Sequence, residues 1–531
     1  MIGNNLPIGD VHFSNKVNTY MIRIILIAFV IYGMSSKITV NSWLGGEVFL
    51  SESFTSSEIS MLVITFATAV ILCMNKTTLL WASENGYIDI VKFSILIGAD
   101  FNITDENGAT LLARAALKGN YDIANVLWKA GVDLNKPDKS ENTLLMCASY
   151  MGRLDVVQML LEMDKGCCGT KTSWSSLLSF MAHERKGCLR MKLSLDLNFM
   201  DSKGRTALML ASEKGHIEVV DALIDAGAHL TTRNCFGNTA LITASLEGHK
   251  EVVNLLIDSG TQNLNEKNTV GNTALMLASI EGLEGVVKVL IDAGADLNIR
   301  DDDDTALILA SQNGFKDIAE MLIDAGADLN FQSSNGNTAL IWASLNHTSG
   351  DRDYSDIVQM LADAGADLNT KNKVGRTALI LASREGVKDN VEILVAAGAV
   401  VDIDTPDKSA LKWASSRGYE DVVEVLVRAG ANLNADQDGW TSLALAAYNG
   451  YENITNILVS AGAQLDAQTE YLGRTALMWA CVRGHTQIVE ILTTNGANLN
   501  MKDKDGFTAL GLAKKSANAD IETLLRGVGA F

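Results

Sequence analysis

Residues 206–230, TALMLASEKGHIEVVDALIDAGAHL, contain the pattern from which the fold of this chain can be predicted. Its apolar residues recur at helical spacing in two short runs, and Gly215 separates the runs with a tight turn. Thr206 opens the first run, where its hydroxyl can accept a hydrogen bond from a free N–H group of the first helical turn. Gly227 follows the second run, as glycine does where a helix ends in the left-handed conformation. The stretch therefore predicts two short helices joined by a turn.

The same pattern recurs along most of the chain. The motif Thr-x-Leu-x-x-Ala begins at Thr77, Thr110, Thr143, Thr206, Thr239, Thr273, Thr305, Thr338, Thr377, Thr441, Thr475 and Thr508, and Ser409 opens a variant of it. Most steps between motifs are 32 to 34 residues, but the step after Thr143 is 63 residues and the step after Thr338 is 39. A period of this size predicts stacked units, each of which buries its apolar face against its neighbours.

The repeated unit resembles the ankyrin repeat. The residues that carry the resemblance are Thr-x-Leu-x-x-Ala, a glycine turn, and then Val-Val-x-x-Leu-Ile-Asp-Ala-Gly-Ala-Asp-Leu-Asn, in about 13 copies between residues 75 and 528. The resemblance implies an all-α solenoid of helix-turn-helix units with protruding β-turn fingers and a concave face that binds partner proteins. Where the family has Pro and His after the Thr, this chain has mostly Ala and then Met, Ile or Leu. That departure weakens hydrogen bonding between repeats but leaves the fold intact.

The array divides into two stretches of regular repeats, residues 75–163 and residues 204–531, the second of which includes a C-terminal cap. Residues 164–203 lack the motif and allow two interpretations. They are either a degenerate repeat, with Ser176-Leu177-Leu178 and Ala182 in its first helix, or a looped insertion.

Residues 1–74 do not follow the repeat pattern. Their apolar runs, 24–32 and 61–74, are shorter than the roughly 20 residues that span a bilayer. Three hypotheses stay open for this segment: a helical cap on the first repeat, a short membrane hairpin or anchor, and a cleaved signal peptide.

The charge balance restricts the partners. Lys and Arg number 43 against 63 Asp and Glu, which gives a formal net charge of -20. A surface this acidic repels phosphate backbones. We therefore expect that the chain does not bind nucleic acid and that its partner is a protein with a basic patch. The seven cysteines have no disulfide-framework spacing, which favours reduced thiols in the cytoplasm. Membrane association through residues 20–74 is the alternative.

No motif predicts catalysis, a cofactor or a metal site. Residues 166–172 lack the Gly-Lys-Thr of a phosphate loop, and Cys167, Cys168, His183 and Cys188 lack the usual spacing of zinc ligands. The acidic run 301–304 lacks the glycine and the distal glutamate of a calcium loop and predicts a solvated finger tip. Three histidines follow a turn glycine and are interpreted as structural turn residues: His216, His249 and His485.

One place in the motif, two residues after its Leu, alternates between leucine and tryptophan. The tryptophans there are Trp81, Trp342, Trp413 and Trp479, and we interpret them as core packing residues. Arg114 stands in the same place. Because a buried unpaired guanidinium is costly, we expect Arg114 to lie at an open edge or to pair with a carboxylate such as Glu84. On that basis Arg114→Leu should be neutral or stabilising.

The predicted binding site lies in the last repeats. The residues that flank the finger-tip glycine, or precede the glycine between helices, are small or polar in most repeats. In the last repeats they become aromatic and basic: Trp440, Tyr448, Tyr471, Leu472, Arg474, Arg483 and Phe507. Tryptophan, tyrosine and arginine are enriched at interface hot spots, so we predict that these side chains are exposed along a concave strip that binds a partner protein. The competing interpretations are chance, with capping for Phe507, and a site at Tyr150-Met151 and Phe236-Leu246.

Two functions follow from this sequence. The first is a non-enzymatic protein-interaction scaffold. The second is a membrane-anchored adaptor or channel-like protein that uses the N-terminal apolar runs.

Overall fold

The computed structural model describes residues 75–165, 194–260, 263–301, 304–345, 354–403, 408–435 and 439–530. In these ranges the chain forms 26 helices, and the only β pairing is two isolated bridges at finger bases, so the predicted all-α class is confirmed. Residues 1–74 and 166–193 lie outside the described residues. The three hypotheses for the N-terminal segment fall there, as do the 166–172 stretch and the candidate zinc ligands Cys167, Cys168, His183 and Cys188.

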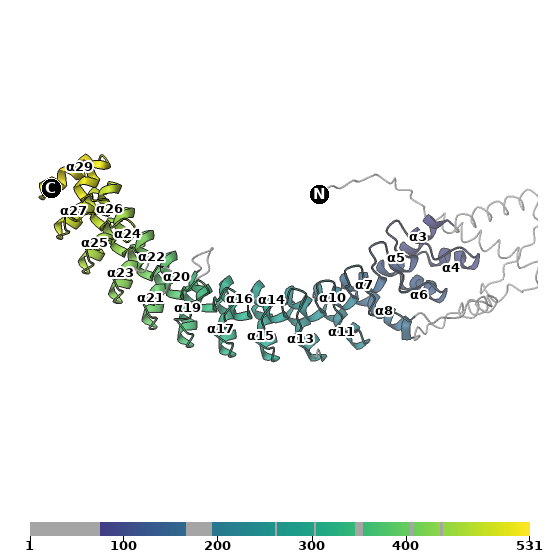
Figure 1. The fold of residues 1–531 in the computed structure, drawn as a ribbon. Coiled ribbons are helices and arrows are strands. Elements are labelled where there is room, and N and C mark those ends of the chain that lie inside the picture. The colour runs from purple at the N-terminus through teal and green to yellow at the C-terminus, as the bar shows by residue number, and fades with distance from the viewer. Residues whose placement is uncertain are drawn as a thin grey trace, which may run out of the picture. The chain divides into compact units, whose positions relative to one another are not determined.

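Each repeat contributes one helix to each of two series (Figure 1). The first helices are α3 (Lys76–Glu84), α5 (Leu111–Leu117), α7 (Leu144–Tyr150), α10 (Ala207–Glu213), α12 (Ala240–Leu246), α14 (Ala274–Glu281), α16 (Ala306–Asn313), α18 (Ala339–Leu345), α20 (Ala378–Glu385), α22 (Ala410–Arg417), α24 (Ser442–Asn449), α26 (Ala476–Arg483) and α28 (Ala509–Lys515). The second helices are α4 (Ile88–Leu96), α6 (Tyr121–Lys129), α8 (Leu154–Lys165), α11 (Ile217–Asp225), α13 (Lys250–Asp258), α15 (Glu284–Asp292), α17 (Lys316–Asp324), α19 (Tyr354–Asp363), α21 (Lys388–Ala396), α23 (Glu420–Arg428), α25 (Glu452–Ser460), α27 (Thr486–Thr494) and α29 (Ala519–Gly527).

The motif threonine is the N-cap of most first helices, whereas in α3 the N-cap is Asn75 and Thr77 lies within the helix. The Thr441 hydroxyl accepts a hydrogen bond from the Ala444 amide at 3.1 Å, and Ser409 serves Lys412 in the same way at 3.4 Å. The capping function predicted for this position is therefore confirmed. The glycine at the other end of the helix has a positive φ, which is 75° at Gly282. A Cβ at Gly282 would lie 2.4 Å from the Phe315 ring, so the next repeat also requires glycine here.

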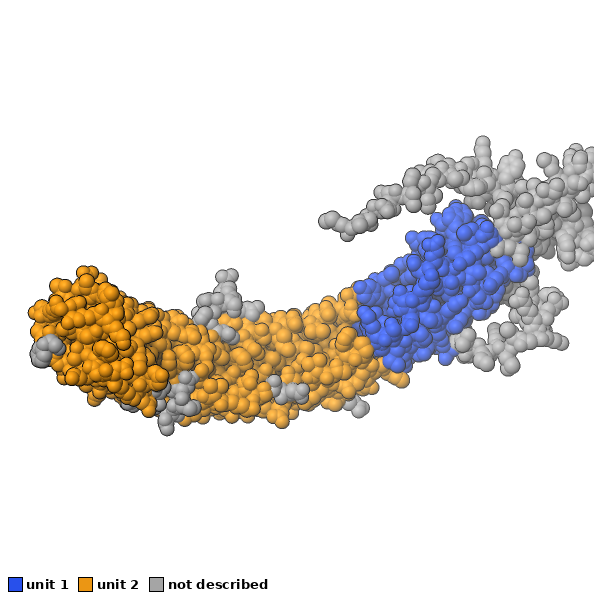
Figure 2. All heavy atoms as spheres, turned by 45° about the horizontal axis from the view of Figure 1, so that its top comes forward, with its two compact units in different colours: residues 1–210, 225–228 blue, residues 211–224, 229–531 orange. Residues whose placement is uncertain are grey.

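The chain divides into two compact units, residues 1–210 with 225–228 and residues 211–224 with 229–531, and only the described residues of each are coloured in Figure 2. In the second unit each first helix packs on the first helix of the next repeat, and the second helices pack on one another in a parallel row. Val252, Val253 and Leu256 of α13 are fully buried between these rows. Burial of one such side chain contributes about 1.5–3 kcal/mol to stability, and the same burial pattern recurs from repeat to repeat.

Polar contacts also join neighbouring repeats of the second unit. The Asp296 amide donates to the Asn265 side chain at 2.9 Å, and the Thr269 amide of one finger donates to the Phe236 carbonyl of the preceding finger at 2.9 Å. His249 Nε2 lies 3.0 Å from the Glu213 carbonyl, and His485 makes the equivalent contact with the preceding repeat. These two histidines are structural turn residues, as predicted, and each joins its own repeat to the preceding one.

The acidic run 301–304 lies in the finger between α15 and α16. The Asp304 amide donates to the Asp301 carboxylate at 2.6 Å, which closes the turn, and Asp302 and Asp303 lie outside the described residues.

Hydrogen bonds in the first unit bear on the two interpretations of residues 164–203. The Asn135 side chain accepts from the Asp196 amide at 2.8 Å and donates to the Ser194 carbonyl at 2.8 Å. Asn265 uses the same contact to bind the corresponding Asp of the next repeat. The Leu195 amide also donates to the Asp164 carboxylate of α8 at 2.8 Å. We therefore propose that residues 195–200 complete the repeat that opens at Thr143, and that the residues before them are an insertion into that repeat.

This proposal predicts that the insertion can be removed. Replacing residues 164–194 with one glycine would join Met163 to Leu195 as Gly294 joins Ala293 to Ala295 in a regular repeat. The shortened chain should keep the helical content expected for its length, with a melting temperature within a few degrees of the parent, because loop length alone changes stability by less than about 1 kcal/mol per doubling. Circular dichroism measures both. Loss of helicity beyond the deleted residues would instead favour a degenerate repeat that bridges its neighbours.

The motif position that alternates between leucine and tryptophan, in the first helix of each repeat, is less buried than we predicted. Trp479 is buried, Trp342 and Trp413 are half-buried, and Trp81 is 47% exposed, which contradicts the core assignment for Trp81. The side chain at this motif position points toward the fingers, because Trp479 Nε1 donates a hydrogen bond to the finger residue Thr469 at 3.4 Å. Burial there therefore depends on the neighbouring side chains, and the Trp81 ring has a stacked Tyr87 with centroids 4.7 Å apart.

Arg114 stands in the same place and is paired, as predicted. Its guanidinium lies 3.3 Å from Glu84 and 2.6 Å from Asp105. Asp105 is the buried partner of the two and was not expected from the sequence.

Candidate protein-binding site

The Trp479 ring on α26 is the centre of an aromatic cluster. It stacks on Trp440 with ring centroids 4.9 Å apart and planes 24° apart, and Tyr448 of α24 meets it edge-on at 5.2 Å. Trp440 and Tyr448 also contact each other edge-on at 5.7 Å. Trp479 itself is only 7% exposed, so it supports the other two rings from below. Such ring pairs stabilise one another by about 0.5–1.5 kcal/mol beyond burial alone.

Two arginines cover these rings. The Arg474 guanidinium lies 4.9 Å from the Trp479 centroid, and the Arg483 guanidinium lies 4.6 Å from the Tyr448 centroid. Both distances are within the range of cation–π attraction. Arg474 is also held by the buried Asp503 at 3.2 Å. We call Trp440, Tyr448, Arg474, Trp479 and Arg483 the Trp479 cluster.

The cluster brings together four of the seven predicted site residues, while the other three lie in the fingers and the last repeat. Tyr471 is 85% exposed, and the carbonyl of its neighbour Leu472 accepts from the Lys504 amide of the following finger at 3.0 Å. Phe507 is half-buried under Lys515, whose Nζ lies 4.5 Å from the ring centroid.

The exposure predicted for these side chains is only partly correct. Tyr471 and Arg483 are exposed, but Trp440 and Tyr448 are half-buried because they pack on Trp479. At the competing position, Phe236 is 60% exposed and Leu246 is half-buried.

Sequence reasoning missed a second group of residues around Trp413 of α22. Four cationic groups lie within 6 Å of its ring centroid: Arg376 at 5.5 Å, Arg384 at 5.9 Å, Lys408 at 4.9 Å and Arg417 at 5.5 Å. We call these five residues the Trp413 cluster. A sequence signal for it existed, because Arg417 immediately precedes Gly418 just as Arg483 immediately precedes Gly484.

Comparison with known families agrees with this architecture. A family model for ankyrin repeats in three copies matches residues 79–173, 229–301, 300–372, 349–437, 379–469 and 443–530, and a model for the single ankyrin repeat matches residues 203–235. The chain belongs to the ankyrin-repeat family. Ankyrin repeats are generally protein–protein interaction modules, and proteins built from them are typically non-enzymatic. A search of curated proteins gave no match.

In the last repeats of this ankyrin array, the two series of helices differ in net charge. Every second helix from α13 to α29 carries a net negative charge. In contrast, the first helices α22, α26 and α28 carry a net positive charge. Part of the overall charge of -20 therefore lies on the second helices.

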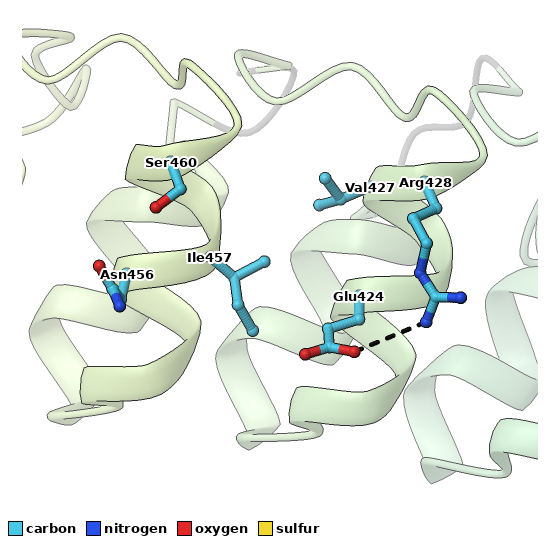
Figure 3. A pocket seen from close by; sticks show the side chains of 6 residues that line it. All are labelled: Glu424, Val427, Arg428, Asn456, Ile457 and Ser460. Carbon is cyan, nitrogen blue, oxygen red and sulfur yellow. Dashed lines mark ion pairs between the residues drawn. The ribbon is translucent and has the colours of Figure 1, made fainter.

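A groove lies on the second-helix side between α23 and α25 (Figure 3). It has a volume of about 330 Å³, and its lining residues are Glu424, Val427, Arg428, Asn456, Ile457 and Ser460. Glu424 and Arg428 point toward each other and form an ion pair at 3.5 Å, while Ile457 points from α25 into the gap. The lining has one self-compensated ion pair and no nucleophile with an adjacent base, so it does not suggest chemistry.

Two cysteine thiols in the described ranges are also unsuited to chemistry. Burial raises the pKa of the Cys481 thiol to about 12 and that of Cys147 to about 11. A thiol with so high a pKa is a poor nucleophile at neutral pH. No group of three or more metal-ligating side chains converges among the residues that the structure describes. None of the helices it describes is long and apolar enough to cross a bilayer.

Proposed function

We propose that this ankyrin-repeat chain is an interaction scaffold that binds a partner protein through the fingers and first helices of its last repeats. The observation that supports this most directly is the Trp479 cluster. Its aromatic rings and arginines are preorganised by stacking on a buried platform, so little side-chain entropy remains to be lost when a partner binds. Tyr471 and Arg483 then offer exposed contact area at its edge.

The best test removes contact area without disturbing the platform. In a full-length chain carrying Tyr471→Ala and Arg483→Ala, the affinity for the partner should fall by about tenfold or more, because exposed Tyr and Arg at hot spots each cost over 1 kcal/mol when truncated. The partner is first captured with the wild-type chain and identified by mass spectrometry. Its affinity for purified wild-type and variant chains is then measured by calorimetry.

Phe236→Ala is the matched control, because it also removes an exposed aromatic side chain from a finger. Binding that survives the double substitution but is lost with Phe236→Ala would move the site to the competing position. Binding that survives all three would contradict a finger and first-helix interface in these repeats.

The expectation of a partner with a basic patch can be made more specific. The acidic second helices would be the surface for such a partner, and we propose that they form a separate interface or keep nucleic acid away.

The cytoplasm is the compartment that we propose for the chain. The membrane-anchored adaptor or channel-like function stays a hypothesis that rests on residues 20–74. Recovery of the full chain in the soluble fraction without detergent would contradict it.

A further inference from the structure

The groove between α23 and α25 has apolar walls that the fold leaves partly open. Val427 of α23 and Ile457 of α25 line it and are only half-buried, whereas their chain neighbours Leu426 and Leu458 are fully buried. Ile457 points into the gap, and Val427 lies on the facing helix (Figure 3). Apolar surface that is still in contact with water gains stability when a partner covers it. The gap can therefore take an apolar side chain from another molecule.

Polar contacts mark the two ends of this groove. At the N-terminal turns of the two helices, the Asn453 side chain of α25 donates to the Glu420 carboxylate of α23 at 2.8 Å. Toward the C-terminal end of α23, Arg428 forms its ion pair with Glu424 at 3.5 Å. An apolar side chain that enters the groove therefore has a defined place between a bridge of side chains and an ion pair.

The rest of the lining favours a protein segment over a small charged ligand. Asn456 and Ser460 are its remaining residues, and both are neutral. The volume of about 330 Å³ is at the lower end of the range for small-molecule pockets. No unpaired charge in the lining would select a cofactor, so the groove fits one or two side chains of a larger partner.

The charges beside the groove select a basic partner. Asp421 of α23 and Glu452 of α25 are exposed in the first turns of their helices, and no cation in the described ranges pairs with either carboxylate. The flanking helices α21 and α27 also carry a net negative charge. The helix dipole stabilises a carboxylate in the first turn, but an exposed carboxylate still attracts a cation from a partner.

The distance between the apolar and the acidic side chains restricts the partner further. A helix rises about 1.5 Å per residue, so Asp421 lies about 9 Å along α23 from Val427. By the same measure Glu452 lies about 7.5 Å along α25 from Ile457. Alternate residues of an extended chain face the same side and are about 6.6 Å apart. A Lys or Arg two residues from an apolar residue would therefore reach one of these carboxylates while the apolar side chain fills the gap.

We propose that the groove between α23 and α25 is a second protein-binding site, which takes a basic segment of a partner protein in extended form. An apolar side chain of that segment packs between Val427 and Ile457. A Lys or Arg two residues away pairs with Asp421 or Glu452. This inference rests on the proposed function, because it gives the partner's chemistry for the separate interface on the second helices. The site shares no residue with the Trp479 cluster.

The experiment uses the full-length chain and fluorescein-labelled peptides of about ten residues, with fluorescence polarisation as the measurement. The Leu probe contains the sequence Lys-Ser-Lys-Ser-Leu between Gly/Ser flanks. The Ser probe replaces its Leu with Ser, and the Glu probe replaces both Lys with Glu. We expect saturable binding of the Leu probe that weakens several-fold as salt rises, because the ion pairs are exposed. The Ser probe should bind about tenfold more weakly, since it buries no apolar side chain, and the Glu probe should not bind saturably.

Ile457→Ala should weaken binding of the Leu probe about three- to tenfold, because it removes most of one apolar wall. The matched control is Ile393→Ala. Ile393 has the same place in α21, is half-buried like Ile457 and does not line the groove. Its replacement should leave binding unchanged.

A second pair of variants tests the charges without altering the core. Asp421→Asn should weaken binding of the Leu probe about threefold, which is the size of effect expected for one exposed ion pair. Asp389→Asn is its control, because Asp389 is exposed at the same place in α21. Circular dichroism checks the fold of all four variants. If Ile457→Ala loses helicity, the comparison of the two Asp variants decides.

The inference is overturned if the Leu probe does not bind, if the Ser probe binds as tightly, or if either control weakens binding as much as the variant it matches. It is also overturned if the chain with Tyr471→Ala and Arg483→Ala no longer binds the Leu probe, since the probe would then occupy the first-helix site. The proposed function is tested separately. It fails if the captured partner is indifferent to Tyr471 and Arg483, whatever the peptides do.

Discussion

Replacing Trp479 with alanine should destabilise the C-terminal repeats by about 3–5 kcal/mol, which is the usual cost of truncating a buried tryptophan. The ring is 7% exposed, supports both Trp440 and Tyr448, and donates its indole N–H to Thr469. Because a repeat array is stabilised by interfaces between neighbours, the loss should be local. Hydrogen exchange should speed up across residues 439–530 and change little in the repeats that precede α20.

The matched control is Trp479→Leu, because leucine occupies this place in other repeats and is buried there, as at Leu445 and Leu512. It should cost about 1–2 kcal/mol, mostly from the lost ring stacking. Unchanged protection of residues 439–530 from hydrogen exchange in the alanine variant would show that the Trp479 cluster does not stabilise these repeats.

The period of the sequence was sufficient to predict the fold. A motif that returns every 32 to 34 residues requires units that stack, and the capping Thr and turn Gly of each unit determine where its helices begin and end. These features are local, and each copy reports them independently. The described residues confirm them in both units.

The site was predictable only in part, because it depends on contacts between repeats. Trp440 and Trp479 are 39 residues apart in sequence, and their stacking follows from the exact rotation of one repeat on the next. The sequence identified both residues but assigned one to the surface and the other to the core. Together they form a single layered unit, in which the core ring positions the surface ring.

The Trp413 cluster was missed for a related reason. Arg384 and Arg417 belong to successive repeats, and each looks like an ordinary solvated arginine when its own helix is considered alone. Their convergence on one ring, and their shared Glu385, appear only when the repeats are stacked.

Arg114→Leu, which the sequence suggested would be neutral or stabilising, should instead destabilise the first unit by about 1–3 kcal/mol at neutral pH, because it leaves a buried carboxylate without its counterion. Arg114 Nε donates to Asp105 at 2.8 Å, and Asp105 also accepts from the Ala109 and Asn107 amides. Burial by itself would raise the pKa of Asp105, but the Ala109 amide, the Arg114 side chain and the Asn107 amide outweigh it and lower the pKa below its ordinary value of 3.8.

The effect of this substitution should depend on pH in a defined direction. Since the folded protein lowers the pKa of Asp105, the ionised carboxylate contributes stability above about pH 4, and that contribution is lost as the pH falls through the lowered pKa. Without Arg114 the pKa of Asp105 should rise. The gap in stability between wild type and Arg114→Leu should therefore be widest at pH 6–7 and should narrow as both proteins protonate Asp105 in acid.

Denaturant unfolding at a series of pH values measures this gap, with Lys118→Leu as the control. Lys118 pairs with the same Glu84 at 3.2 Å, but its side chain is 55% exposed and makes no ion pair with Asp105. An exposed pair of this kind contributes about 0–1 kcal/mol, so the control should change little at any pH. A gap for Arg114→Leu that stays constant down to pH 3 would mean that the substitution acts through packing, and that Arg114 does not hold Asp105 in its charged form.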